Sequence, residues 1–149
     1  MALNGFQYRS GPWDCDAQSS KASTAIAVLD ALKAVSGVLL PLTTGVKNVG
    51  VALQAKAVGD ATTTAIQYIK TSSGRTVFLA GEKRAASALA ATDAMDHHDI
   101  KGATGAQGFD SSATTNLDIY VESVITIGAA DVGQALIKFA DPAYQHAAN

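Results

Sequence analysis

The amino-acid sequence predicts a mainly β protein, folded as a compact β-sandwich or β-barrel-like domain with at most one or two short helices. One observation is the spacing of turn signals, which separate short apolar runs as turns separate strands. These signals are the small-residue pairs Ser36-Gly37, Thr44-Gly45, Gly59-Asp60 and Ser73-Gly74. The other is composition. Of the 149 residues, 48% are hydrophobic but only 6% are aromatic, so Ala, Val, Leu and Ile must form most of the core. A chain of this length can bury one such core.

Seven segments have the residue types and flanking turns of strands. They are residues 25–35, 38–40, 49–53, 65–69, 76–79, 117–127 and 134–139. The first segment is ambiguous, because Ile26, Leu29 and Lys33 also have helical spacing, and we favour a strand there. Pro41 has no backbone N–H to donate, so the strand beside it is expected at the edge or a bend of its sheet.

The first 23 residues are expected to form an extended N-terminal arm in front of a single β-rich domain of residues 24–149. The arm is polar but carries Phe6, Tyr8 and Trp13, which need a surface to bury them. Trp and Tyr are enriched among the residues that dominate binding energy at protein interfaces. We therefore predict that these three aromatic residues bind a partner. The alternative is that the segment folds back on its own core as a strand or loop.

Two connecting regions follow the first group of strands. Residues 82–94 are rich in Ala and other helix formers, so a short helix is slightly favoured over an irregular connection. Residues 101–116 combine Gly, Ser and Thr with low hydrophobicity, which predicts a long loop.

Charge and hydropathy limit the classes of partner. The net charge is −2 and Lys83-Arg84 is the only adjacent basic pair, so no nucleic-acid-binding patch is predicted. No run reaches the ~18 apolar residues of a membrane span and no signal-peptide pattern is present, so we expect a chain made in the cytoplasm without a membrane anchor. Only 16% of residues are charged, against about a quarter in ordinary soluble domains. Such a surface either exposes small residues or is covered by neighbouring subunits.

Catalytic motifs are absent from the sequence. It has no G-x-S-x-G, P-loop, Rossmann glycine motif or H-E-x-x-H, so no enzymatic activity and no cofactor are expected. Cys15 is the single cysteine, which excludes an intrachain disulfide and a cysteine-pair zinc site and predicts a free thiol.

One cluster contains possible metal ligands, Asp96-His97-His98-Asp99. On a strand, adjacent side chains face opposite ways, so only alternate residues of this cluster could share an ion. A catalytic metal usually needs three protein ligands, and His146 is the only other histidine. We predict a polar strand end or loop here, with no metal bound; an inter-subunit or pH-sensitive contact is an alternative.

Three short motifs occur in a fixed order within residues 25–80. They are Asp30-Ala31-Leu32, Ser36-Gly37 and Gly50-Val51-Ala52-Leu53. This order resembles that in the small capsid cement, or head decoration, proteins of tailed bacteriophages, where a Gly-Asp-Ala-Leu-like start leads to a Ser-Gly turn and then a Gly-Val-Ala-Leu-like strand. The match covers about half of the chain, and Leu29 stands where the family has a glycine.

The resemblance implies a β-rich virion protein, made in the host cytoplasm, that sits on the outer face of an icosahedral head and clamps neighbouring subunits of the major capsid protein. It implies self-association, with a homotrimer favoured, and no enzymatic activity. Alternatives remain open: a glycan- or receptor-binding β-domain that uses the 102–116 loop, a tail-tube or head-completion component, and a metal-dependent hydrolase around His97, His98 and His146.

Overall fold

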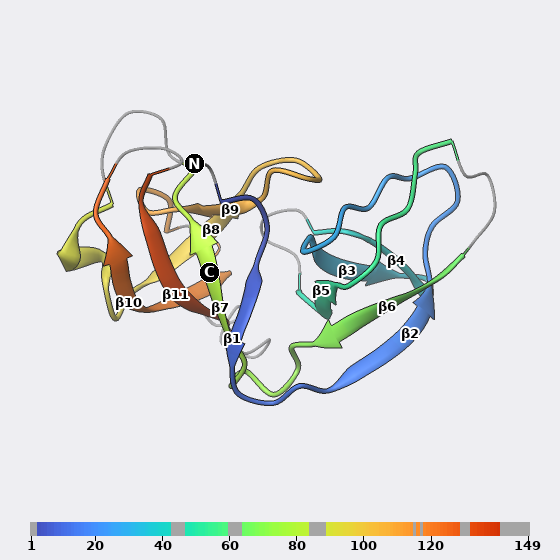
Figure 1. Ribbon diagram of the computed structural model, residues 1–149, viewed down its shortest axis with the longest axis horizontal. Coiled ribbons are helices and arrows are strands. Elements are labelled where there is room, and N and C mark those ends of the chain that lie inside the picture. Colours follow the sequence, from blue (N-terminus) through green and yellow to red (C-terminus); the bar gives the residue numbers. More distant parts are fainter. Residues whose placement is uncertain are drawn as a thin grey trace.

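The computed structural model describes residues 3–42, 47–59, 64–83, 89–114, 116, 118–128 and 132–140. Within these residues, eleven strands form two antiparallel sheets, and one short 3₁₀ helix, η1 (Ala91–Asp93), connects two of the strands (Figure 1). The predicted mainly β class is therefore confirmed.

The five-stranded sheet lies at the right of Figure 1 and is formed by residues 15–70. In spatial order its strands are β2 (Cys15–Ser19), β6 (Ala65–Lys70), β5 (Gly50–Ala52), β3 (Ala31–Val35) and β4 (Val38–Pro41). Pro41 thus ends a strand that is last in the order, as its missing N–H predicts. Ser20 forms a parallel bridge to Leu39 of β4, and Lys21 N donates to Leu39 O at 2.9 Å. The first and last strands therefore meet, and the sheet curls into a partly closed barrel.

The six-stranded sheet combines an N-terminal strand with residues 77–139. In spatial order its strands are β1 (Gln7–Ser10), β7 (Val77–Gly81), β11 (Gln134–Phe139), β10 (Ile119–Thr126), β8 (His97–Lys101) and β9 (Gly108–Asp110). This sheet curls in the same way, because Glu82 forms a parallel bridge to Phe109 of β9 and Lys83 N donates to Phe109 O at 2.8 Å.

Apart from β1, the two sheets have the same topology. Strands β2 to β6 lie in the order first, fifth, fourth, second, third, and strands β7 to β11 repeat that order. The register agrees as well. Ala52 N donates to Asp30 O in one sheet as Val121 N donates to Asp96 O in the other, and the preceding residues, Leu29 and Met95, both have positive φ angles of 72° and 62°. The chain thus contains two copies of one five-stranded unit, which we call the first unit (residues 15–70) and the second unit (residues 77–139).

A continuous hydrophobic cluster joins the two units. It contains Ala31, Leu42, Val51 and Ile69 from the first unit, and Phe78, Phe109, Ile119, Val121, Ile137 and Phe139 from the second. Phe6, which precedes β1, is fully buried in the same cluster.

A polar clasp also links the units. Asp30, fully buried in the first unit, accepts hydrogen bonds from Gly105 N at 2.9 Å and from the Thr104 hydroxyl, both in the second unit. Nearby, Gln107 Oε1 accepts from Ala31 N at 2.7 Å. The clasp, defined as Asp30, Thr104, Gly105 and Gln107, satisfies the buried N–H of Ala31 and gives the buried Asp30 carboxylate partners across the junction.

Several expectations need correction. Residues 101–116 are not one long loop, because β9 pairs with β8 in the middle of them. The expected first strand begins only at Ala31. In the described part of residues 82–94 the only helix is η1, and residues 84–88 lie outside the described residues, as do the expected turn at Thr44-Gly45, Asp60 and Leu117.

Residues 1–23, expected as an arm, carry two of the strands. In this structure β1 pairs with β7 and β2 pairs with β6, so the alternative of a segment that folds back on its own core describes residues 7–19. The chain passes from one sheet to the other at the bend between β1 and β2, at the bottom of Figure 1.

Candidate functional site

The structure separates the three aromatic residues that we predicted to bind a partner. Phe6 is fully buried, with its ring centroid 4.9 Å from that of Phe139, and so belongs to the core. Tyr8 is partly buried and packs edge-on against Trp13, with ring centroids 4.8 Å apart. Trp13 is 54% exposed. Of these three residues, Trp13 and the partly buried Tyr8 thus offer an aromatic surface, and we call Tyr8, Gly11, Pro12 and Trp13 the aromatic corner.

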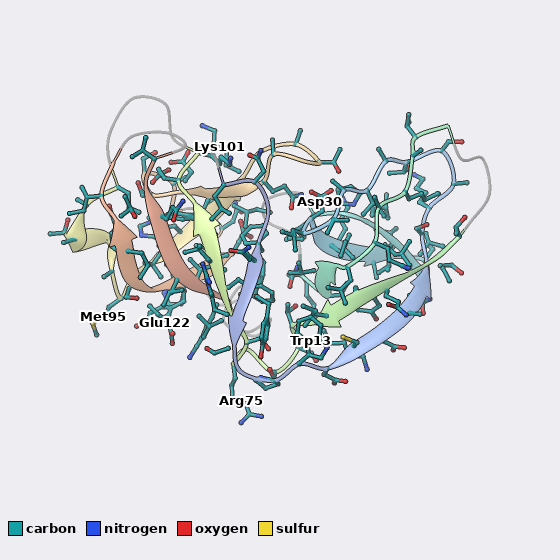
Figure 2. All side chains as sticks on the ribbon, viewed as in Figure 1. Trp13, Asp30, Arg75, Met95, Lys101 and Glu122 are labelled. Carbon is teal, nitrogen blue, oxygen red and sulfur yellow. The ribbon has the colours of Figure 1, made fainter. Side chains whose placement is uncertain are left out.

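The backbone of the aromatic corner is closely held. Gly11 has φ of 91°, and a Cβ there would lie 2.5 Å from Arg75 O, so only glycine fits this bend. The Tyr8 hydroxyl donates to Gly11 O at 2.7 Å, and the Thr76 hydroxyl donates to Pro12 O at 2.8 Å. Trp13 therefore lies on a preformed turn between β1 and β2, in the lower part of the molecule in Figure 2.

A second exposed surface lies on the hairpin of β3 and β4. The turn uses positive φ at Ser36 and Gly37, 50° and 80°, as a two-residue hairpin requires. Lys33 opposes Leu40 and Val35 opposes Val38, so these four side chains share one face. Leu32 and Leu39, on the other face, are buried.

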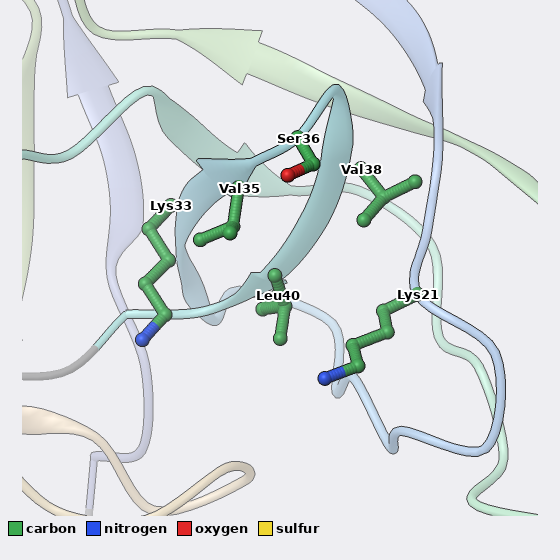
Figure 3. A pocket seen from close by; sticks show the side chains of 6 residues that line it. All are labelled: Lys21, Lys33, Val35, Ser36, Val38 and Leu40. Carbon is green, nitrogen blue, oxygen red and sulfur yellow. The ribbon is translucent and has the colours of Figure 1, made fainter.

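The outer face of this hairpin forms a shallow cavity of about 400 Å³. Its lining, which we call the hairpin patch, is Lys21, Lys33, Val35, Ser36, Val38 and Leu40. Val35 is 50% exposed. Figure 3 shows Lys33 and Lys21 on opposite sides of Leu40, with Val35, Ser36 and Val38 higher along the hairpin. Two ammonium groups beside an apolar floor suit a partner that presents an apolar side chain next to carboxylates.

The second unit has a different surface at the equivalent position. The pair Asp99–Asp110 stands where the first unit has Lys33–Leu40. The pair Lys101–Gly108 stands where it has Val35–Val38. These charges pair with each other, since Lys101 Nζ lies 3.6 Å from Asp110 Oδ2. The apolar character of the hairpin patch is thus a feature of the first unit that the shared topology does not require.

The hairpin patch was not predicted from the sequence. The available signal was the alternation in residues 32–40, where Leu32 and Leu39 fall on one face and Lys33, Val35, Val38 and Leu40 on the other. A two-residue turn at Ser36-Gly37 fixes that pairing.

The Asp96-His97-His98-Asp99 cluster lies at the start of β8, as expected of a polar strand end. His98 is buried, with Nε2 3.3 Å from Asp93 O, and its Nδ1 has no hydrogen-bond partner among the described residues. His97 points to the other side and packs against Tyr120, with ring centroids 5.0 Å apart and ring planes inclined at 56°. Burial lowers the pKa of His97 below its ordinary value, and the adjacent Asp96 offsets part of that effect.

No group of three metal-ligating side chains occurs in the part of the chain that the structure describes. His146, the third candidate ligand, lies outside the described residues.

Buried carboxylates elsewhere hold the backbone. Among the described residues, three carboxylates besides Asp30 are at least nine-tenths buried, and each accepts a backbone N–H from a neighbouring segment. The bonds are Ser111 N to Glu82 Oε2 at 3.2 Å, Asn116 N to Asp99 Oδ1 at 2.8 Å and Ile100 N to Asp118 Oδ2 at 3.0 Å. Buried carboxylates can indicate a catalytic site, and these three accept hydrogen bonds from the backbone, one of them from Ile100 in β8.

Residues 102–116, the segment named in the glycan-binding alternative, contain β9. Phe109, its aromatic residue, is fully buried, and Thr104, Gly105 and Gln107 belong to the clasp. The free thiol of Cys15 lies exposed on β2.

Comparisons with family models, with curated proteins and with solved structures find no match to this chain. Among the described residues, no helix has the length and apolar character needed to cross a membrane.

Proposed function

We propose that this chain is a structural virion protein, a cement or decoration protein that binds the outer surface of an icosahedral phage head and stabilises contacts between major capsid subunits. The observation that carries the proposal is the aromatic corner, where Trp13 is 54% exposed on a turn fixed by Gly11 and Thr76. A large rigid aromatic side chain binds without losing much conformational entropy, which is why Trp dominates many interfaces.

Two further features support a binding role rather than catalysis. The sequence has low charge, as interface cores do, and the buried carboxylates are used by the fold. The order of motifs in residues 25–80 resembles that of tailed-phage decoration proteins, whose partners are the major capsid protein and further copies of themselves.

Stabilisation would follow from mass action. A protein that binds the assembled shell, and not its separated subunits, adds its binding free energy to the apparent stability of the shell. Such a protein needs no moving part and no reactive group.

The test is co-sedimentation with heads of the tailed phage that carries this chain, emptied of DNA and stripped of surface proteins. The wild-type chain is expected to pellet saturably, and Trp13→Ala to weaken binding by about tenfold or more, as loss of an interface anchor does. The matched control is Val58→Ala, which truncates another exposed apolar side chain, 64% exposed and outside the aromatic corner. Absence of pelleting, or equal affinity for Trp13→Ala and wild type, would overturn the proposal.

A further inference from the structure

Met95 is an unusual surface residue. It is 76% exposed, more than any other large hydrophobic side chain among the described residues, and its φ is 62°. A side chain other than glycine in this left-handed region costs free energy, and an exposed apolar side chain gains nothing from the core. The fold therefore holds an apolar side chain outward at a strained position, between Asp93 and Asp96.

The internal repeat allows Met95 to be compared with the residue at the equivalent position of the first unit. The equivalent of Met95 in the first unit is Leu29, which also has positive φ and also precedes the second strand of its unit. Leu29 O accepts from Phe6 N at 2.9 Å, and Gly5 lies so close that a Cβ on it would be 2.6 Å from Leu29 Cβ. Phe6 leads directly into β1 of the six-stranded sheet, so this position in the first unit is covered by the segment that connects to the other sheet. In the second unit the same position points to solvent.

The hairpin patch is complementary to this exposed position. Its floor of Val35, Val38 and Leu40 suits a thioether side chain, and its cavity of about 400 Å³ is large enough for one. Lys21 and Lys33 lie on either side of Leu40 and suit carboxylates beside a docked apolar side chain (Figure 3).

The carboxylates beside Met95 are held in place. Asp93 Oδ2 accepts from Ala90 N and Asp96 Oδ1 accepts from His97 N, both at 2.8 Å. Each bond orients its carboxylate, and the negative charges remain to attract a basic surface. We call Asp93, Met95 and Asp96 the acidic knob.

We propose that the acidic knob of one copy docks into the hairpin patch of a second copy, head to tail. The knob and the patch lie on different units of the chain, with Met95 at the lower left of the second unit in Figure 2. Each copy therefore binds one neighbour through its acidic knob and another through its hairpin patch. Such a heterologous interface closes into a ring when the rotation between copies allows it. A ring of three agrees with the oligomer that the family resemblance favours. The inference does not depend on the capsid as partner.

The experiment measures molar mass by light scattering over a range of protein concentrations. The wild-type chain is expected to form a ring, and Met95→Glu and Val35→Glu to be monomers. An equimolar mixture of the two variants is then expected to give a heterodimer and nothing larger, because one variant keeps its patch and the other its knob. A symmetric patch-to-patch interface would instead leave Met95→Glu associated and would overturn the inference.

Two further variants separate assembly from folding. Met95→Gly removes the side chain and relieves the positive φ, so its thermal stability as a monomer is expected to be equal or higher while association is lost. Val58→Glu adds a charge at an exposed valine outside both surfaces and is expected to associate as wild type does. A monomeric wild-type chain at all concentrations, or an associated Met95→Gly, would overturn the inference without bearing on capsid binding.

Discussion

Asp30→Asn is the change that tests most directly how the two units are held together. Asp30 is fully buried and accepts three hydrogen bonds. Gly105 N donates to Oδ1 at 2.9 Å, whereas Ala27 N, at 3.0 Å, and the Thr104 hydroxyl donate to Oδ2. The side chain of Asn has the same shape, but its amide nitrogen is a donor.

The expected magnitude follows from this geometry. The Thr104 hydroxyl can rotate and accept from the new amide, but Ala27 N–H and Gly105 N–H cannot, so one backbone donor faces the amide nitrogen in either orientation of the substituted side chain. A hydrogen bond to a charged acceptor contributes about 1.5–3 kcal/mol, and the substitution removes that charge and leaves one partly buried donor facing the amide nitrogen. We expect a loss of about 2–4 kcal/mol in the free energy of unfolding, on the order of a third of a typical domain stability.

The assay is chemical denaturation at neutral pH, with thermal unfolding as a second probe. For a chain of this size the change corresponds to a fall in Tm of about 4–16 °C. Asp14→Asn is the matched control, because it makes the same substitution at an exposed site and is expected to change stability by less than about 0.5 kcal/mol. A change of less than about 0.5 kcal/mol for Asp30→Asn as well would refute the view that the clasp stabilises the junction.

Three other changes test the core, the aromatic corner and the pH response. Phe78→Ala empties a fully buried site in the shared cluster and is expected to cost about 3–5 kcal/mol in denaturation experiments, whereas a loss below about 1 kcal/mol would contradict its place in the core. Gly11→Ala places a Cβ 2.5 Å from Arg75 O, so we expect lower stability by more than about 1 kcal/mol together with weaker shell binding; unchanged binding would show that the shape of the corner is irrelevant. The folded pKa of His97 is lowered, so the unfolded chain takes up the proton more readily and stability falls as the pH drops below about 6.5. His97→Gln should therefore flatten the pH dependence of stability between about pH 7 and pH 5, and an unaltered slope would count against this origin.

Local features of the fold could be predicted from the sequence because local chemistry determines them. The Ser36-Gly37 turn requires positive φ, which small residues accept, and Pro41 needs an edge because it cannot donate. The alternation in residues 119–126 predicted strand β10 for the same reason.

Features that depend on long-range contacts were beyond local reasoning. Strand β9 has three residues within a glycine-rich stretch, and what makes it a strand is its pairing with β8 and its bridge to Glu82. Phe6 could as easily have bound a partner as filled the core, since its burial depends on Phe139, near the other end of the chain.

The internal repeat could not be recognised in the sequence either, because most equivalent positions in the two units carry different residues. Lys21 and Lys83 occupy equivalent positions, as do Asp30 and Asp96, but Leu39 corresponds to Phe109, and Ala31 to His97. Backbone pairing conserves the topology while the side chains that fill each barrel differ, so no simple sequence periodicity marks the duplication.

The most direct test of the proposed function is an electron cryo-microscopy map of stripped phage heads incubated with a saturating amount of the chain. We predict added density on the outer surface in which the aromatic corner, with Trp13, faces the major capsid protein and neighbouring copies touch between the acidic knob and the hairpin patch. Shells without added density, or bound copies whose Trp13 points to solvent, would contradict it.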